Sequence, residues 1–248
     1  MGRRFKIIMQ YDGSNYCGWQ RQRYQPSVQA KIENALQPLN QNQPVMVIAA
    51  GRTDSGVHAR RQTAHFDLVT DLSPETIRKA LNATLPDDIY IDYCQEVDKK
   101  FHARFTAINR TYHYQVVVKP DVFLHKYVWL VNFRFDLELL QECAELVKGE
   151  HDFTALCRAA TETENKMATI YESRWEEQDE LLVYIITANR FLYAMVRMLV
   201  GSMMEVARGK YSIGAFKNLL GKNDTAMQVY TAPAQGLFLW NVKYQEDN

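Results

Sequence analysis

The sequence predicts an α+β protein of two ferredoxin-like (split βαβ) units, whose antiparallel sheets are joined around a central active-site cleft. Over the first hundred residues, the patterns follow the order strand, helix, strand, strand, helix, strand, which is that of a split βαβ unit. Strands and helices alternate again in the remainder, and no segment rich in Pro, Gly or Ser separates the halves. We therefore expect an N-terminal domain over 1–100 and a C-terminal domain over 101–248.

In the first domain, strands are recognised by apolar or alternating runs, and helices by their first residues. The first strand ends in a turn signal at Asp12-Gly13-Ser14-Asn15. Pro26 and Ser27 open one amphipathic helix, and Ser73 followed by Pro74 caps a second. We expect strands over 3–12, 44–50, 62–68 and 86–97, and helices from Ser27 and from Ser73 to about Ala83.

The second domain begins with a strand of strict alternation and has more elements than the first. A turn at Gln178-Asp179-Glu180 separates two of its strands, and a long helix with an apolar face follows them. We expect strands over 109–118, 167–177, 181–188 and 236–244, and helices over 136–148, 190–208 and 213–219.

Composition limits the classes of function. No run of about 18 uncharged apolar residues exists, and the N-terminus has no signal-peptide core, so we expect a cytoplasmic protein without membrane contact. The four cysteines show no C-x-x-C spacing, and no nucleotide-binding motif is present. We therefore expect no metal and no cofactor.

The charge distribution permits a nucleic-acid partner although the net charge is zero. Residues 1–70 hold nine bases and four acids, a balance of +5, and residues 134–180 hold five bases and thirteen acids, a balance of −8. A solvated surface of mixed sign is the alternative interpretation.

The most unusual segment is Gly51-Arg52-Thr53-Asp54-Ser55-Gly56-Val57-His58-Ala59, where two glycines bracket a charged tetrapeptide after an apolar strand. Such a loop would present Asp54 at the rim of a sheet, with Arg52 placed to bind a phosphate or to keep the carboxylate ionised. The alternative is a polar turn in which Asp54 caps nearby amides. We interpret His58 as a structural residue, because no second His or Cys is near it.

Arg197 lies within an apolar helical run. A buried guanidinium needs a partner, so Arg197 either pairs with a carboxylate, for which Asp54 is the candidate, or extends to the surface on its long stem. In the segment that begins at Arg110, Tyr112 and Tyr114 share one face of a strand, where aromatic rings pack or stack on an unpaired base. The polar loop 12–22, which includes Arg21, has a composition suited to RNA contact.

Together these segments resemble the tRNA pseudouridine synthase A (TruA) family along nearly the whole chain. Nine motifs occur in the family's order: YDGSNYCGWQRQ at 11–22, S-V-Q-x-x-I-E-x-A-L at 27–36, GRTDSGVHA at 51–59, L-P-x-D-I at 85–89, ARFTA at 103–107, R-x-Y-x-Y at 110–114, HDFTAL at 151–156, FLYAMVR at 191–197 and A-P-A-Q-G-L at 232–237. The sequence departs from the family pattern at Ser55, Met198 and Gln235, which bear on substrate preference.

The resemblance implies an isomerase that converts uridine to pseudouridine at positions 38, 39 and 40 of the tRNA anticodon stem-loop. It implies that Asp54 is the catalytic aspartate, that Arg197 pairs with it, that Tyr112 stacks on the target base and that Arg52 helps to turn the nucleotide out. Arg110 and Arg21 are expected to bind the substrate. The family works without a cofactor, as a homodimer that binds tRNA.

The chemistry suits a single carboxylate. Asp54 could attack C1′, remove the C2′ proton or add to the pyrimidine ring, and the sequence leaves all three open. Three rival functions remain at this stage. They are an RNA-binding protein without activity, a glycoside or nucleoside hydrolase, which usually needs two carboxylates, and a related enzyme that modifies another RNA.

Overall fold

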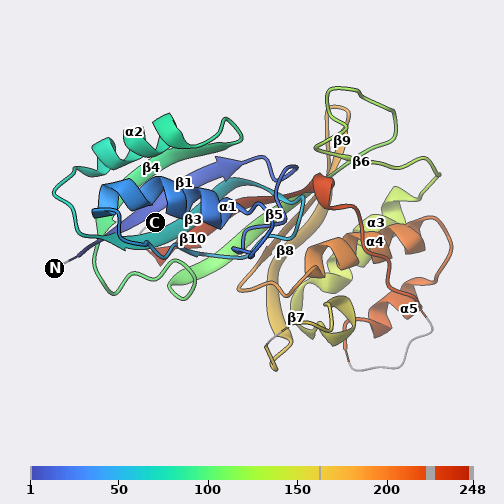
Figure 1. The fold of residues 1–248 in the computed structure, drawn as a ribbon. Helices are drawn as coiled ribbons and strands as arrows, with labels where there is room; N and C mark the ends of the chain where they lie inside the picture. Colours follow the sequence, from blue (N-terminus) through green and yellow to red (C-terminus); the bar gives the residue numbers. More distant parts are fainter. Residues whose placement is uncertain (1, 162, 222–226, 246–248) are drawn as a thin grey trace. The chain divides into compact units, whose positions relative to one another are not determined.

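The computed structural model describes residues 2–161, 163–221 and 227–245, and the chain divides into two compact units (Figure 1). Unit 1 consists of Met1–Ile108 and Phe238–Asn248, and unit 2 of Asn109–Leu237. The chain therefore passes into unit 2 after Ile108, and its last strand belongs to unit 1, whereas we had expected that strand in the second domain. Pairing between distant strands determines this assignment, and local alternation carries no information about it.

The sheet of unit 1 has the strand order β4-β1-β3-β10. Its strands are β1 (Arg3–Tyr11), β3 (His58–Leu68), β4 (Ile89–Val97) and β10 (Leu237–Tyr244). β1 is antiparallel to both β3 and β4, and β10 runs parallel to β3. The two-residue strand β2 (Ile48–Ala49) also pairs with β3, in the antiparallel sense.

Two helices lie on one face of this sheet, α1 (Val28–Leu36) and α2 (Pro74–Thr84) (Figure 1). The predicted cap at Ser73 is confirmed, because its hydroxyl accepts the Thr76 N–H, and Ser27, predicted to open the first helix, also caps it by accepting the Ala30 N–H. On β1 the alternate residues Phe5, Ile7 and Met9 are fully buried, which gives the sheet the apolar face that amphipathic helices require. The 3₁₀ turn η1 (Gln37–Asn40) follows α1.

Unit 2 contains an antiparallel sheet of strand order β5-β9-β8-β7, with β6 parallel to β5. Its α3 packs against both β8 and α4, so unit 2 has its own core. The strands are β5 (Ala107–Val117), β6 (Trp129–Leu130), β7 (Gly149–Asp152), β8 (Met167–Gln178) and β9 (Leu181–Ala188). The helices are α3 (Leu137–Val147), α4 (Met195–Ala207) and α5 (Ile213–Asn218), with 3₁₀ turns η2 (Thr154–Leu156) and η3 (Ala234–Gly236).

The observed elements confirm a mixed α/β chain with mostly antiparallel strands, and they correct several boundaries. The helix expected from residue 190 begins at Met195, because Ala194 has a φ of 60°, in the left-handed region that interrupts a right-handed helix. β3 begins four residues earlier than predicted, at His58, and the strand expected over 44–50 is reduced to Ile48–Ala49. Among the described residues, no helix combines the length and apolar character that crossing a bilayer requires.

Candidate functional site

Asp54 lies in the loop between β2 and β3 of unit 1, where the sequence placed it. The loop closes in a turn, in which the Val57 N–H donates to the Asp54 carbonyl over 3.2 Å. Gly56 has a φ of 75°, which few residues with a side chain adopt. Asp54 is partly buried and Arg52 is exposed. The loop therefore holds an acidic and a basic side chain two residues apart on a tight support.

A second loop of unit 1, residues 12–19, fixes the backbone of the Asp54 loop. The Trp19 N–H donates to the Thr53 carbonyl over 3.1 Å, and the Gly56 N–H donates to the Tyr16 carbonyl over 3.3 Å. The Thr53 hydroxyl and the Tyr11 hydroxyl lie 2.8 Å apart in a buried hydrogen bond. Hydrogen bonds from both sides of Asp54 thus position its backbone.

Gly18 allows the two loops to approach so closely. Its φ is 91°, and a Cβ at this position would lie 2.6 Å from the Thr53 carbonyl oxygen. That separation is shorter than nonbonded atoms tolerate, so any other residue would push the loops apart. The motif therefore depends on a glycine more than thirty residues before Asp54 in the chain.

His58, at the start of β3, helps to hold the 12–19 loop in place. It is only 1% exposed, its Nδ1 accepts the Gly13 N–H over 3.0 Å, and its ring stacks on Phe238 with centroids 4.7 Å apart. Nδ1 also lies 3.1 Å from an Asp12 carboxylate oxygen. These contacts support the structural interpretation of His58.

In unit 1, Arg21 is held by Glu33, a residue that the sequence pattern did not single out. Its guanidinium lies 2.6 Å from the buried carboxylate of Glu33, whose other oxygen accepts the Gln29 amide and the Val47 N–H. About half of the Arg21 side chain stays exposed. The available signal was the position of Glu33 on α1, next to Ile32 on the buried face of the helix.

In unit 2, Arg110 and Tyr112 lie two residues apart on β5, so they share a face, and both are at least nine-tenths buried. An Arg110 Nη donates to the Asn189 carbonyl over 2.9 Å. The Tyr112 ring meets Phe191 edge to face, with centroids 4.9 Å apart.

Tyr114 on the same face of β5 is fully buried, and its hydroxyl donates to the Pro233 carbonyl over 2.8 Å. Burial raises the pKa of Tyr114 well above the usual value. Tyr114 is therefore a core residue.

Arg197 is the third residue of α4. Its Nε donates to the Ala232 carbonyl over 2.8 Å, and its own carbonyl accepts the Ala232 N–H over 3.0 Å. Gly201 lets this segment approach the helix, because a Cβ there would lie 2.1 Å from the Tyr230 carbonyl oxygen. A cation in the first turn of a helix opposes the preference of the helix dipole. Arg197 thus adds to the positive potential of that helix end, which favours a carboxylate or a phosphate nearby.

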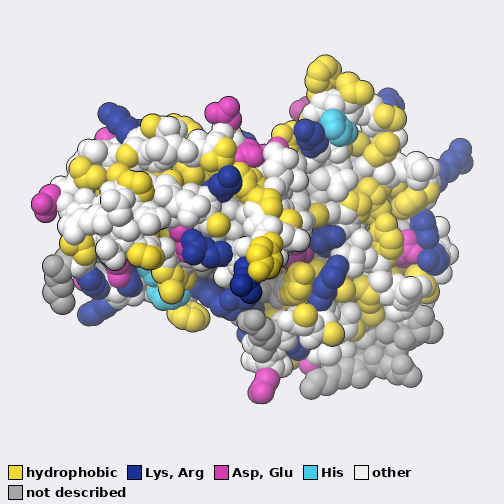
Figure 2. Space-filling model, viewed as in Figure 1, with side chains coloured by type: hydrophobic (Ala, Val, Ile, Leu, Met, Phe, Trp, Pro, Cys, Tyr) yellow, Lys and Arg dark blue, Asp and Glu magenta, His cyan; other side chains and the backbone are white. Residues whose placement is uncertain are grey.

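The six predicted site residues are divided equally between the two units. Asp54, Arg52 and Arg21 belong to unit 1, and Arg110, Tyr112 and Arg197 belong to unit 2. Figure 2 shows Lys and Arg side chains at several places on the surface in view, with Asp and Glu side chains also exposed there, and the net charge of the chain is zero. In the described part of the chain, no three His, Cys, Asp or Glu side chains are grouped so as to hold a metal ion.

Comparison with known proteins gives consistent matches over almost the whole sequence. The family model described as tRNA pseudouridine synthase matches residues 7–106 and 143–245. A tRNA pseudouridine synthase A of Geobacillus sp. (strain WCH70) is 41% identical over 246 residues, which cover 98% of this chain and 99% of the relative. The protein of the same name from Bacillus subtilis (strain 168) is 40% identical and covers 97% and 99%. A solved structure described as a putative chlorite dismutase aligns at a TM-score of 0.22 and 9% identity, too low to support an argument.

Proposed function

This chain belongs to the tRNA pseudouridine synthase family and is an isomerase that acts on tRNA, and from this premise we propose that Asp54 is its catalytic carboxylate. The targets are uridines 38, 39 and 40 of the anticodon stem-loop. The observation that carries the proposal is the support of the Asp54 loop, in which Thr53 and Gly56 are both hydrogen-bonded to the 12–19 loop. A catalytic carboxylate needs such a fixed backbone, because small displacements reduce the rate strongly.

The reaction breaks the N1–C1′ bond of uridine and forms a C5–C1′ bond to the same uracil. A proton leaves C5 and another is returned to N1, so the step is balanced without an oxidant or a reductant. An ionised Asp54 attacks C1′, removes the C2′ proton or adds to the ring, and each role requires the unprotonated carboxylate. Substrate deuterated at C2′ separates proton removal from the other two roles, because only proton removal from C2′ gives a large isotope effect on a single turnover.

The other site residues have supporting roles in this proposal. Arg197 pairs with Asp54 and favours its ionised form, which agrees with its position at the positive end of α4. Tyr112 stacks on the target base, and Arg52, exposed beside Asp54, helps to turn the nucleotide out of its stack. Arg110, on the same strand as Tyr112, and Arg21, with its exposed side, bind the substrate RNA.

The coupling between Arg197 and Asp54 is testable. Replacing Arg197 by Met is expected to reduce kcat by about 10- to 100-fold, which is the equivalent of about 1–3 kcal/mol of charge stabilisation. Arg197→Lys, which keeps the positive charge, should retain more of the wild-type kcat than Arg197→Met at equal tRNA binding. Equal losses of kcat in the two variants would contradict the pairing.

Three further features complete the proposal. The strand order β4-β1-β3-β2, with β2 and β10 on the same edge of β3, supports a ferredoxin-like interpretation of unit 1. The enzyme works as a homodimer in the cytoplasm, without cofactor or metal. Equilibrium sedimentation of the whole chain tests the dimer.

The experiment for the substrate uses tRNA transcripts in which only one of positions 38, 39 and 40 carries C5-tritiated uridine and the other two carry cytidine. Wild type is expected to release tritium from each transcript, and Asp54→Asn is expected to bind the same RNA without release. A further transcript carries the label only at uridines outside these three positions. Release from that transcript, and from none of the other three, would refute the assignment of the anticodon arm.

A further inference from the structure

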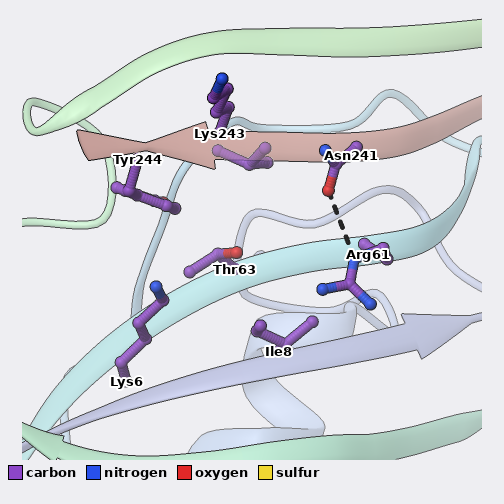
Figure 3. A pocket seen from close by; sticks show the side chains of 8 residues that line it. Lys6, Ile8, Arg61, Thr63, Asn241, Lys243 and Tyr244 are labelled. Atoms are coloured by element: carbon purple, nitrogen blue, oxygen red, sulfur yellow. Dashed lines mark hydrogen bonds between the residues drawn. The ribbon is translucent and has the colours of Figure 1, made fainter. Parts of the chain in front are cut away.

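A cavity of about 420 Å³ lies on the sheet of unit 1, where β3 and β10 stop pairing (Figure 3). Among the described residues, the two strands pair in parallel only at Phe238 with His58 and at Leu239 with Ala59. Beyond these pairs, side chains of β3, β10 and β1 line the cavity together. No residue of the Asp54 loop belongs to the lining, so this is a separate place in the unit.

The lining of this cavity is strongly basic. Lys6, Arg61 and Lys243 contribute to it, and none of the described residues that line it is acidic. Like charges on neighbouring side chains repel one another, and an anion bound among them would offset that repulsion. Thr63 and Asn241 add a hydroxyl and an amide, which are the neutral groups that commonly bind phosphate oxygens.

Local contacts hold two of these bases in place. Lys6 is 3% exposed, and its Nζ lies 4.5 Å from the ring centroid of Tyr244 and 5.3 Å from that of Phe101. Tyr244 is itself fixed by donating its hydroxyl to the Ala103 carbonyl over 2.7 Å. The Arg61 Nε donates to the Asn241 side-chain oxygen over 3.3 Å, the contact drawn in Figure 3. This bond engages Nε and leaves both Nη groups of Arg61 to meet a ligand.

We propose that this cavity binds a backbone phosphate of the tRNA, at a point other than the nucleotide that Asp54 acts on. The inference rests on the proposed function, which supplies a substrate with one phosphate for each nucleotide. Guanidinium and ammonium groups form their strongest hydrogen bonds with such oxygens, and phosphate contacts position an RNA without reading its sequence. The cavity is many times larger than the roughly 30 Å³ that one water occupies, so its volume is sufficient for a phosphodiester group.

The test measures affinity and turnover for Arg61→Gln, Lys243→Gln and the double variant. Binding of unmodified tRNA is followed by filter binding at several KCl concentrations, and isomerisation by tritium release. The double variant is expected to bind about tenfold more weakly at low salt. Its slope of log Kd against log[KCl] should fall by about one, because one phosphate contact is lost. KM should rise while kcat stays at the wild-type value.

Lys79→Gln is the control for each single variant, because Lys79 lies exposed on α2 of the same unit and its replacement removes one positive charge, as Arg61→Gln and Lys243→Gln each do. It is expected to leave both Kd and the salt slope unchanged. Arg61→Lys keeps the charge, so it should bind tRNA more tightly than Arg61→Gln and recover most of the wild-type affinity. This comparison separates the effect of the lost charge from an effect on folding. The thermal midpoint of every variant is measured alongside.

A double variant with the affinity and slope of Lys79→Gln would overturn the proposal. It would also be overturned if tRNA binding were unchanged and sedimentation instead showed altered self-association, because the cavity would then accept an acidic group of another chain. Failure of the proposed function is separate. If wild type releases no tritium but the variants still weaken RNA binding, the cavity assignment stands and the proposed reaction at uridines 38, 39 and 40 falls.

Discussion

Replacing Gly18 by Ala is expected to damage the enzyme through the backbone of the Asp54 loop, without touching a catalytic side chain. The added Cβ would lie 2.6 Å from the Thr53 carbonyl oxygen and 3.1 Å from the Asp54 carbonyl carbon. The two loops must separate to relieve this overlap. The Trp19 hydrogen bond to Thr53 is then lost, and the backbone at Asp54 moves.

The magnitude follows from three contributions. An alanine at a φ of 91° costs about 1–2 kcal/mol in backbone conformation. The lost hydrogen bond contributes about 1 kcal/mol, and loop displacement adds to both. We therefore expect a loss of about 3 kcal/mol in unfolding free energy, and a decrease of the thermal midpoint of roughly 6–12 °C. A backbone shift of about 1 Å at Asp54 should lower kcat about a hundredfold.

Gly209→Ala provides the control for backbone strain. Gly209 has a φ of 81°, and a Cβ there meets no atom within 4 Å. This variant should lose only the conformational contribution, about 1–2 kcal/mol, and should keep the wild-type kcat. The assays are urea denaturation and single-turnover tritium release below the unfolding temperature. Equal stability and equal kcat in the two alanine variants would refute the reasoning, because the clash with Thr53 would then have no effect.

Three further predictions concern stability. Glu33→Gln should lower the unfolding free energy by about 2 kcal/mol, since it replaces a buried, hydrogen-bonded carboxylate; an unchanged urea midpoint would contradict this. Burial lowers the pKa of His65 to about 4, whereas the unfolded chain takes up this proton near pH 6.5, so stability present above pH 6.5 is lost as the pH falls toward 4. Between pH 6.5 and pH 4, the unfolding free energy of wild type should fall by about 2–3 kcal/mol more than that of His65→Asn. Parallel curves of unfolding free energy against pH for the two proteins would refute this prediction. Thr53→Val removes the bond to the Tyr11 hydroxyl and should cost about 1 kcal/mol in a thermal melt, whereas an unchanged midpoint would show that the bond contributes little.

Local signals identified most of the elements, because caps and periodicity act over a few residues. Ser73 caps its helix as expected, the first helix starts beside Ser27 as expected, and the turn before β9 has Asp179 in the left-handed region, at a φ of 51°. The start of α4 could not be predicted in this way. Phe191 follows the helical spacing of the later apolar residues, but the φ of Ala194 interrupts the helix before Met195.

The sequence located the candidate site in part. The glycine-framed loop around Asp54 was visible, because such residues are unusual directly after an apolar strand. Its support by Tyr16 and Gly18 was not visible, since contacts between distant loops leave no local pattern. The same reason explains the missed pairing of Arg21 with Glu33 and the missed cavity around Lys6, which depends on the return of β10 to unit 1.

The most direct test of Asp54 as the catalytic carboxylate compares Asp54→Asn with Asp87→Asn in single-turnover tritium release at saturating tRNA. Asp87 is exposed in the same unit, and its replacement by Asn removes the same charge. Both variants are expected to bind tRNA as wild type does, with wild-type release by Asp87→Asn and no measurable release by Asp54→Asn. Release by Asp54→Asn at the wild-type rate would contradict the assignment of Asp54 as the catalytic carboxylate.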